Sequence, residues 1–555
     1  MKKRLIALSL AAVLGVTLLA GCGGSKETGE QPAPTDGGTT TEEPAQAGGG
    51  VIIHNLGSDP KTIDPALNSA VDGHQVIQSA FEGLCRVDEN QKAVPGMAES
   101  WEVSEDGVTY TFHLRDAKWT DGQPVKAGDF VYAWKRAVDP ATAAEYAYQM
   151  YYLKNAEKIN AGEMSLDDLG VKAVDDKTLE VTLESAVPYF LELLAFPTYM
   201  PVREDIVSAD PEGWALNMET YISNGPFKVT EWNHDDVMKL VKNENYYDAD
   251  KVKLDGIDYV FIVESSTAFS AFEAGEIDYM EAVPSEQIAL LQEKNDPNFK
   301  IYPYLGDYFY VFNVNAEPVN KPEVRKALAY AIDRKQIVEQ VTKAGQMPAK
   351  GFVPAGIPMS DGKDFQETSG DHGMAEDLSK VEEAKKLLAD AGYPNGEGFP
   401  AVEILYNTSE GHKAIAEAIQ AMWKDNLGIN VELRNEEWKV FQTTRNTKQY
   451  VIARHGWIGD YVDPMTFLDM WVTGGGNNDA DYSNPKYDEA IAKAKSSLGA
   501  ERDQAMLEAE KVLMEDMPVM PIYYYTNAVM FREGIENAPK SPLGPVDYRE
   551  ATVKR

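Results

Sequence analysis

Two short segments alternate apolar and polar side chains with a period of two. Residues 108–115 read VTYTFHLR, and residues 177–185 read KTLEVTLES. The apolar positions are Val108, Tyr110, Phe112 and Leu114 in the first segment and Leu179, Val181 and Leu183 in the second. Because successive side chains of a strand point to opposite faces, this alternation predicts two strands that each bury one face.

Three longer segments repeat apolar residues at helical spacing. Residues 320–341 predict a helix with Asn320 as its cap and Pro322 in its first turn. Residues 379–396 predict a second helix, which begins with a capping box of Ser379 and Glu382. Residues 501–518 predict a third helix that stops near a proline. Strand and helix signals are interspersed and no unit of 20 to 50 residues repeats, so the pattern predicts an α/β or α+β protein with several domains.

The N-terminus has the pattern of a secretory signal. MKKR is followed by sixteen apolar residues at 5–20, too short a run for a membrane span. The next residues complete LLAGC, which resembles the lipobox of bacterial lipoproteins. That resemblance implies a signal peptide over residues 1–21 and a lipid on Cys22. The alternative is a plain secretory signal with an incidental cysteine.

The segment after Cys22 differs in composition from the rest of the chain. Residues 23–50 carry almost no apolar side chains, so they cannot bury enough surface to offset the entropy of ordering. We expect residues 22–50 to be a lipidated cysteine with a flexible tether. The remaining chain of about 505 residues from Val51 is long enough for two or three domains.

Charge and cysteine content limit the partners and the disulfides that the chain can have. The net charge of −37 argues against nucleic acid as a partner and against binding anionic lipid by charge. The chain has two cysteines, and lipidation of Cys22 would leave Cys85 without a disulfide partner. Cys85, in FEGLCRV, is predicted to be a small buried apolar residue.

Motifs for catalysis and for metal binding are missing from the sequence. It contains no H-E-x-x-H, G-x-S-x-G or G-x-x-x-x-G-K-[ST]. The seven histidines show no metal-ligand spacing. We therefore expect no cofactor, no metal and no enzyme activity; an envelope peptidase is the competing hypothesis.

One segment nevertheless gathers reactive side chains. Residues 453–467 read ARHGWIGDYVDPMTF. A charged, aromatic segment of this kind is compatible with a catalytic site, a metal site, a ligand clamp or an ordinary polar loop.

Several motifs resemble, in order, the oligopeptide-binding family of extracytoplasmic solute-binding proteins that serve peptide ABC transporters (family 5). The first are DPALNSAVDGHQVIQSAFEGL at 64–84 and the long segment from PGMAESW to WKRAVDP at 95–140. The others are SNGPFKV, KNENYYDADKVKLDGIDY, AGEID, KPEVRKALAYAIDR, ILYNTSE, EEWKVF and DMPVMPIYYYTN. Together they extend over some 450 residues.

This resemblance implies an α/β fold of the periplasmic-binding-protein type, with two lobes, a hinge and an additional third domain. The expected boundaries are residues 51–81, 206–304 and 527–555 for lobe I, 82–205 for the additional domain and 305–526 for lobe II. A ligand would be enclosed between the lobes. The implied function is binding of oligopeptides of varied sequence and their delivery to an ABC permease. Alternatives within the family are a signalling-peptide receptor and a relative that binds dipeptides, nickel, sugars or haem.

The resemblance also implies a set of ligand-binding residues. Asp460 matches the aspartate that takes the α-ammonium group of the peptide, and Gly456, Trp457 and Ile458 match a strand that pairs with the ligand backbone. Arg454 and His412 match positive groups that meet the carboxylate of the ligand.

Aromatic positions around the cleft match Trp438, Tyr132, Tyr304 and Phe309. This chain departs from the family at Phe309, where a tyrosine is common, and at Ser69 and Thr342, where some relatives carry an acid and a lysine. These last two departures leave the peptide length open.

Each match has a structural alternative. Asp460 could instead cap a turn, and Arg454 could pair with a structural carboxylate. His412 could be a surface residue at the start of a helix. Trp457 and Trp438 also suit an ordinary core. Asp463 and Pro464 are assigned to the turn, and His455 has no assigned role.

The implied partners are a peptide, an ABC permease with its ATPase subunits and the membrane that holds the lipid anchor; the protein itself is expected to be a monomer.

Overall fold

The computed structural model describes residues 49–554, so Cys22, the predicted signal peptide and nearly all of the tether lie outside the described residues. In this part of the chain the largest sheet has eleven strands. Their order is β15 (Val431–Glu436), β14 (Val402–Asn407), β16 (Ile452–Ile458), β12 (Phe299–Phe312), β17 (Val519–Phe531), β11 (Tyr279–Met280), β1 (Val51–Asn55), β10 (Gly256–Val260), β9 (Val237–Lys242) and β8 (Phe227–Asn233), with β13 (Met347–Pro348) paired to β17.

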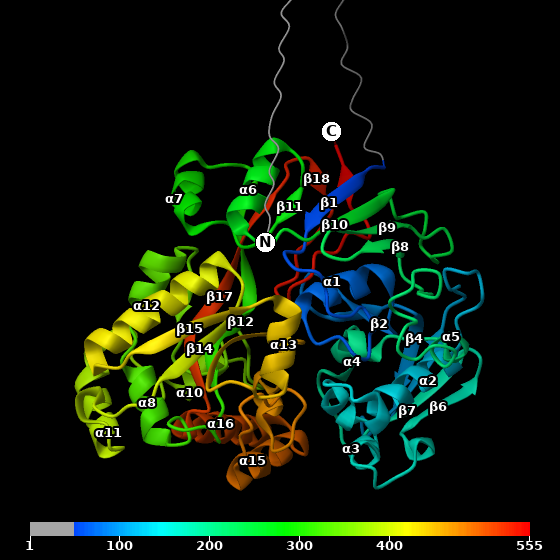
Figure 1. The fold of residues 1–555 in the computed structure, drawn as a ribbon. Helices are drawn as coiled ribbons and strands as arrows, with labels where there is room; N and C mark the ends of the chain where they lie inside the picture. The colour runs from blue at the N-terminus through cyan, green and yellow to red at the C-terminus, as the bar shows by residue number, and fades with distance from the viewer. Residues whose placement is uncertain (1–48, 555) are drawn as a thin grey trace, which may run out of the picture. The chain divides into compact units, whose positions relative to one another are not determined.

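Two long strands, β12 and β17, join two halves of this sheet (Figure 1). We call β11, β1, β10, β9 and β8 the first half-sheet, and β15, β14 and β16 the second half-sheet. The first part of β12 pairs with the end of β17 beside β11, and its last part pairs with β16. The register between β12 and β17 shifts between Pro303 and Asp307. Because such irregularities bend a strand pair, we expect the hinge between the half-sheets in this stretch.

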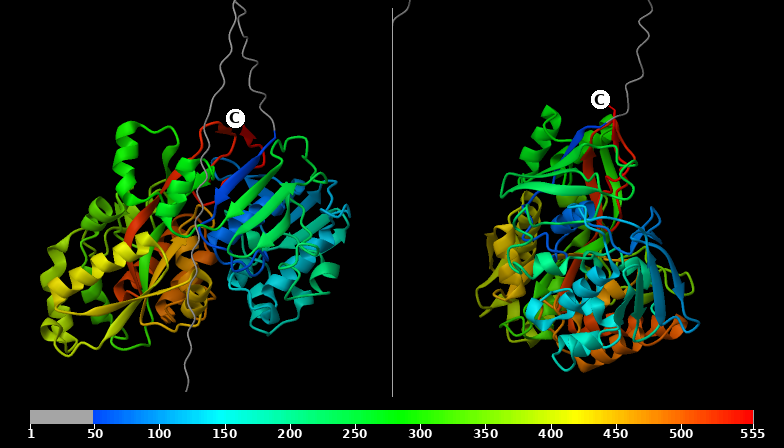
Figure 2. Two further views of the ribbon diagram at one scale, coloured as in Figure 1. Left: turned by 45° about the horizontal axis from the view of Figure 1, so that its top comes forward. Right: turned by 90° about the vertical axis from the view of Figure 1, so that its right-hand side faces the viewer.

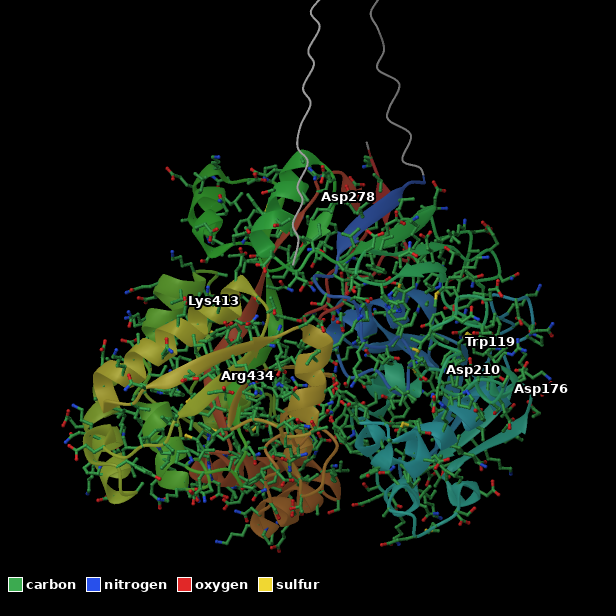
Figure 3. The ribbon with its side chains drawn as sticks, in the orientation of Figure 1. Trp119, Asp176, Asp210, Asp278, Lys413 and Arg434 are labelled. Atoms are coloured by element: carbon green, nitrogen blue, oxygen red, sulfur yellow. The ribbon has the colours of Figure 1, made fainter. Side chains whose placement is uncertain are left out.

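Helices cover both half-sheets, as the views in Figures 1 and 2 show. The first half-sheet is accompanied by α1 (Val71–Ala80), α6 (Ser265–Ala274) and α7 (Ser285–Lys294). The second half-sheet is accompanied by α8 (Pro322–Tyr330), α11 (Val381–Asp390), α12 (Glu410–Leu427), α13 (Trp438–Asn446), α15 (Pro485–Lys495) and α16 (Gly499–Asp516). Shorter helices are α3 (Ala156–Asn160), α4 (Phe190–Leu193), α5 (Glu204–Val207), α9 (Arg334–Gln336), α10 (Phe365–Ser369) and α14 (Met465–Leu468). Figure 3 labels Asp278 beside β11, Lys413 on α12 and Arg434 on β15.

A separate four-stranded sheet confirms the two strands predicted from alternation. Its order is β4 (Ala98–Val103), β5 (Thr109–Leu114), β7 (Thr178–Thr182) and β6 (Val171–Asp175). Every second residue of β5 is buried. Beside this sheet lie α2 (Ala127–Val138) and the fully buried Trp119, whose indole donates to Asp129 at 3.1 Å (Figure 3). We call residues 82–205 the small-sheet region. The remaining strand pairs are β2 (Cys85–Val87) with β3 (Ala93–Pro95) and β18 (Ile535–Glu536) with β19 (Thr552–Val553).

Two of the three helix predictions need correction. The helix expected over residues 320–341 breaks after Tyr330, and a new turn begins at Asp333, whose carboxylate accepts the N–H of Gln336. The break places the buried guanidinium of Arg334 against the carbonyl groups of Pro521 and Ala329. Tertiary hydrogen bonds therefore override the helical pattern.

The capping box expected at Ser379 is not formed. Asp377 accepts the Ser379 N–H instead, and α11 begins at Val381. The third helix, α16, ends at Asp516 before Pro518, as predicted.

Other expectations can be compared with the described residues. Cys85 is a buried free thiol, which confirms its predicted role as a core residue. No helix among residues 49–554 is long and apolar enough to cross a membrane. The strands of the two half-sheets and of the small sheet fall within the ranges expected for lobe I, lobe II and the additional domain, whose boundaries stay a prediction. The mixed α/β class is confirmed.

Candidate ligand-binding site

A cavity of about 640 Å³ lies where the two half-sheets and the small-sheet region meet. Its lining comes from the segment before α1, the loop after β11, β12, α12, β16 and β17. The expected site residues that line it are Arg454, Gly456, Trp457, Ile458, Asp460, His412, Trp438 and Tyr304. Ser69 and Thr342 line it as well.

The strand β16 has a free edge at this cavity. β14 pairs only with the first two residues of β16. Gly459 donates its backbone N–H to the carbonyl of Leu305 in β12, and backbone groups alternate their direction along an antiparallel ladder. The backbone groups of Gly456 and Ile458 therefore face away from β12, toward an edge that no strand of residues 49–554 occupies. At that edge the backbone of Gly456 lies beside the ring of its neighbour, with His455 Nδ1 2.8 Å from Gly456 N.

Asp460 lies just beyond the end of β16, and its carboxylate receives hydrogen bonds from uncharged donors. Gln149 Nε2 donates to Oδ2 at 2.6 Å, and Tyr146 Oη donates to Oδ1 at 3.3 Å. Thr466 Oγ1 lies 3.4 Å from Oδ2. Gln149 and Tyr146 belong to the small-sheet region, so this part of the chain completes one end of the cavity.

The Asp460 carboxylate has no cationic partner in the described part of the chain. Burial and the neighbouring charge of Asp469 raise its pKa well above the usual value. A protonated amine bound here would reverse this effect, because an opposite charge favours the ionised carboxylate. The site is therefore suited to an ammonium group.

Arg454 lies at the other end of the free edge, six residues before Asp460. At about 3.3 Å per residue this separation is about 20 Å along the strand. Arg454 Nη2 donates to Tyr525 Oη at 2.9 Å, Nη1 lies 3.4 Å from Asn407 Oδ1, and the guanidinium lies 4.9 Å from the centre of the Tyr308 ring. Among residues 49–554 no carboxylate pairs with it, so the alternative role as a structural ion-pair partner is not observed.

His412, in the first turn of α12, differs from its expected role as a positive group. Its Nδ1 lies 3.3 Å from Tyr308 Oη. Burial and the nearby charge of Arg454 lower the pKa of His412 well below its usual value. The imidazole is therefore neutral at physiological pH in the ligand-free protein and acts there as a hydrogen-bonding group.

Aromatic rings form further walls of the cavity. Trp457 is 6% exposed and stacks on Tyr146 with ring centres 6.0 Å apart. The Trp438 indole donates to Asp72 Oδ2 at 2.8 Å. Tyr304 lies 5.5 Å from the Tyr525 ring.

Two of the expected residues do not line the cavity. Tyr132 lies on α2 in the small-sheet region, with its hydroxyl 3.2 Å from Ser208 Oγ. Phe309 is fully buried and stacks on His455 at 4.7 Å. It points to the face of β12 opposite Tyr308, because side chains alternate along a strand. Neither residue is among those that line the cavity, and their ligand roles stay a prediction.

The residues that donate to Asp460 or accept from Arg454 were not predicted from the sequence. They are Tyr146, Gln149 and Tyr525. The available signals were the aromatic and polar runs EYAYQMYY at 145–152 and IYYYTN at 522–527. Asp463 accepts the Met465 N–H at 2.9 Å, in agreement with its assignment to the turn.

Contacts across the cavity join elements of the two half-sheets. Glu410, at the start of α12, accepts hydrogen bonds from Ser265 Oγ at 2.6 Å and from Ser266 N at 3.0 Å, both at the start of α6. Lys439 of α13 pairs with Asp59, which follows β1. We call these the cross-cavity contacts.

No group of three or more histidine, cysteine or acidic side chains in residues 49–554 is placed to hold a metal ion.

The chain matches a known protein family. The family described as "Bacterial extracellular solute-binding proteins, family 5 Middle" matches residues 92–479. The chain is 39% identical to the oligopeptide-binding protein OppA of Bacillus subtilis, over the whole length of both proteins.

Among solved structures, Haemophilus influenzae OppA in complex with RPPGFSPFR has a TM-score of 0.85 and 33% identity, covering 91% of this chain and 99% of that one. The unliganded open form of the murein tripeptide-binding protein MppA, also 33% identical, covers 91% and 98% but has a TM-score of only 0.62. The expected binding-protein fold is thus confirmed, in an arrangement nearer to the peptide complex than to the open form. The chain belongs to the bacterial extracellular solute-binding proteins of family 5.

Proposed function

We propose that this protein binds peptides in an extended conformation between its two half-sheets and delivers them to an ABC importer. The observation that carries the proposal is the free edge of β16, with an uncompensated carboxylate at Asp460 and an uncompensated guanidinium at Arg454. A zwitterionic chain has the complementary charges at its two ends. The relatives named as oligopeptide-binding proteins support this assignment.

The free edge explains how one site can accept many sequences. A ligand that adds a strand to β16 forms main-chain hydrogen bonds, which do not depend on its side chains. The ammonium group on Asp460 fixes the register of the ligand, and Arg454 meets its carboxylate, with neutral His412 close by. Water that fills the rest of the cavity adapts to different side chains.

The cross-cavity contacts stabilise a closed state, in which the two half-sheets are held together. Binding shifts the population toward this state only if the ligand has contacts there that the open state lacks. The contact between the ligand and Asp460 can be one of these, because Tyr146 and Gln149 of the small-sheet region enclose the Asp460 carboxylate.

The proposal extends to the place and partners of the protein. A lipid on Cys22 would hold it at the outer face of the membrane, close to a permease with its ATPase subunits, as a monomer. It would bind and release peptides without cleaving them, in keeping with a family of solute-binding proteins.

Calorimetry with short peptides of mixed sequence tests the proposed function. We expect peptides with free termini to bind, N-acetylated peptides to lose at least about a hundredfold in affinity, and C-amidated peptides to lose less. Equal binding of free and acetylated peptides would contradict the role of Asp460. Mass spectrometry after long incubation distinguishes a binder, which returns the peptide intact, from a peptidase.

A further inference from the structure

A second cavity of about 240 Å³ adjoins the first one. The residues that line both cavities are Val71, Val263, Ser265, Glu281, Ala282 and Tyr304. A water molecule occupies about 30 Å³ in the liquid, so the second cavity has room for about eight waters, or for a long side chain with a few waters.

The position of this cavity suits one side chain of an extended ligand. It lies on the side of α1, β1 and the loop after β11, whereas β16 belongs to the second half-sheet. Side chains of an extended chain alternate between opposite faces. The side chains of a peptide paired with β16 thus point alternately toward the first half-sheet and toward the second.

Two carboxylates, Asp72 and Glu281, line the second cavity, and only one of them has a cation. Glu281 accepts from Lys540 Nζ at 2.6 Å and from Tyr279 Oη at 2.8 Å. Asp72 is 7% exposed, and its partners are the N–H of Gly73 at 2.7 Å and the indole of Trp438 at 2.8 Å. In residues 49–554 no lysine or arginine pairs with Asp72.

The histidine that lines this cavity, His54, does not offset the charge of Asp72. Burial lowers the pKa of His54 to about 3, so its ring is neutral. Burial raises the pKa of Asp72 to about 6, so its carboxylate is ionised at neutral pH and gives the second cavity a negative charge without a cationic partner among residues 49–554. A buried charge of this kind is costly unless a partner of opposite sign is present.

We propose, on the basis of the proposed function, that the second cavity is a subsite for one basic side chain of the bound peptide, with Asp72 as the specificity-determining residue. The aliphatic stem of a lysine or arginine packs against Val71 and Val263 at the mouth, and its cationic head reaches the carboxylate of Asp72. An apolar side chain leaves this carboxylate unpaired, and an acidic one is repelled. The subsite thus adds a preference to a site whose main-chain contacts are indifferent to sequence.

A peptide panel tests this subsite. In alanine peptides of three to eight residues, each position in turn is replaced by lysine, arginine, norleucine or glutamate, and affinities are measured by calorimetry. At one position we expect lysine and arginine to bind about tenfold more tightly than norleucine, and glutamate more weakly than either. Asp72→Asn keeps an acceptor for the Trp438 indole and should reduce the lysine-to-norleucine ratio to below about threefold.

The matched control is Glu264→Gln. This substitution removes one negative charge from an exposed residue next to α6, outside both cavities, and should leave the ratio unchanged. No basic preference at any position in the wild type, or a preference that survives Asp72→Asn, would overturn the proposal.

Two further outcomes are distinguishable. If none of the alanine peptides binds, the proposed function fails rather than the subsite. If Asp72→Asn does not fold, a crystal structure of the wild type with the preferred lysine peptide decides, because the lysine Nζ either contacts Asp72 or lies elsewhere.

Discussion

Asp460 provides the sharpest test at the scale of a single residue. Asp460→Asn retains the hydrogen-bonding shape of the side chain but removes its charge, so a bound ammonium group loses its proposed anionic partner. We expect peptide affinity to fall by at least about a hundredfold, because a buried charge without its partner costs several kcal/mol. Calorimetry measures this loss, and Asp463→Asn is no substitute as a control because Asp463 pairs with Arg502 in the fold. Exposed Glu397→Gln is the suitable control and should bind like the wild type.

The same residue predicts a proton linkage. Burial and Asp469 raise the pKa of the Asp460 carboxyl in the free protein, whereas a bound ammonium lowers it again. Binding therefore releases protons, and affinity declines as the pH falls below the pKa of the free state. Calorimetry in two buffers with different ionisation enthalpies detects the release. Proton uptake on peptide binding, or no change in bound protons at any pH, would contradict the raised pKa of Asp460 in the free protein.

Sequence resemblance identified residue types at this scale better than it identified their directions. Arg454 lies in β16 and Asp460 just beyond its end, so their spacing was readable from the chain. Tyr132 and Phe309 were aromatic in the right segments but point elsewhere, since side-chain direction depends on register and on helix rotation. Tyr146 and Gln149 are some 310 residues from Asp460, and only tertiary folding brings them together.

At the scale of elements, Glu410 joins α12 to α6 across the cavity. Its carboxylate accepts the Ser266 N–H, one of the donors that the start of a helix leaves unpaired. We expect Glu410→Ala to destabilise the closed state and to speed peptide release by about fivefold, the effect of losing a typical helix cap. Stopped-flow fluorescence measures this rate. Glu417→Ala, on the same helix, removes only a pairing with Lys413 and should leave the rate unchanged.

The elements also show what periodicity can and cannot predict. The alternation in β5 and β7 was reliable because one face of each strand packs on the core. The long helix expected at residues 320–341 failed because a buried arginine, Arg334, takes its partners from β17 and α8. The strand order, and with it the free edge of β16, has no signature in local sequence, since neighbouring strands come from distant segments.

At the scale of the whole molecule, the lipobox makes a prediction about location. Cys22→Ser should release the protein from the membrane fraction into the medium or the soluble fraction, because the variant lacks the thiol that would carry the lipid. Cell fractionation with immunoblotting measures this. Cys85→Ser changes the other cysteine, a buried thiol in the fold, and should remain with the membrane. Release of both variants, or of neither, contradicts anchoring through Cys22.

Closure should couple ligand binding to the arrangement of the half-sheets. They are joined through β12 and β17, whose register shifts near Pro303, whereas the cross-cavity contacts form only when the halves are together. A peptide at 100 times its dissociation constant should add about 2.7 kcal/mol to the free energy of unfolding and should reduce the radius of gyration measured by X-ray scattering. Asp460→Asn at the same peptide concentration should be at most half occupied, so it should gain no more than about 0.4 kcal/mol and contract less, because the ammonium contact that favours the closed state is lost. A wild-type protein that gains stability without contracting would show that binding does not depend on closure, and the hinge would then lie outside the mechanism.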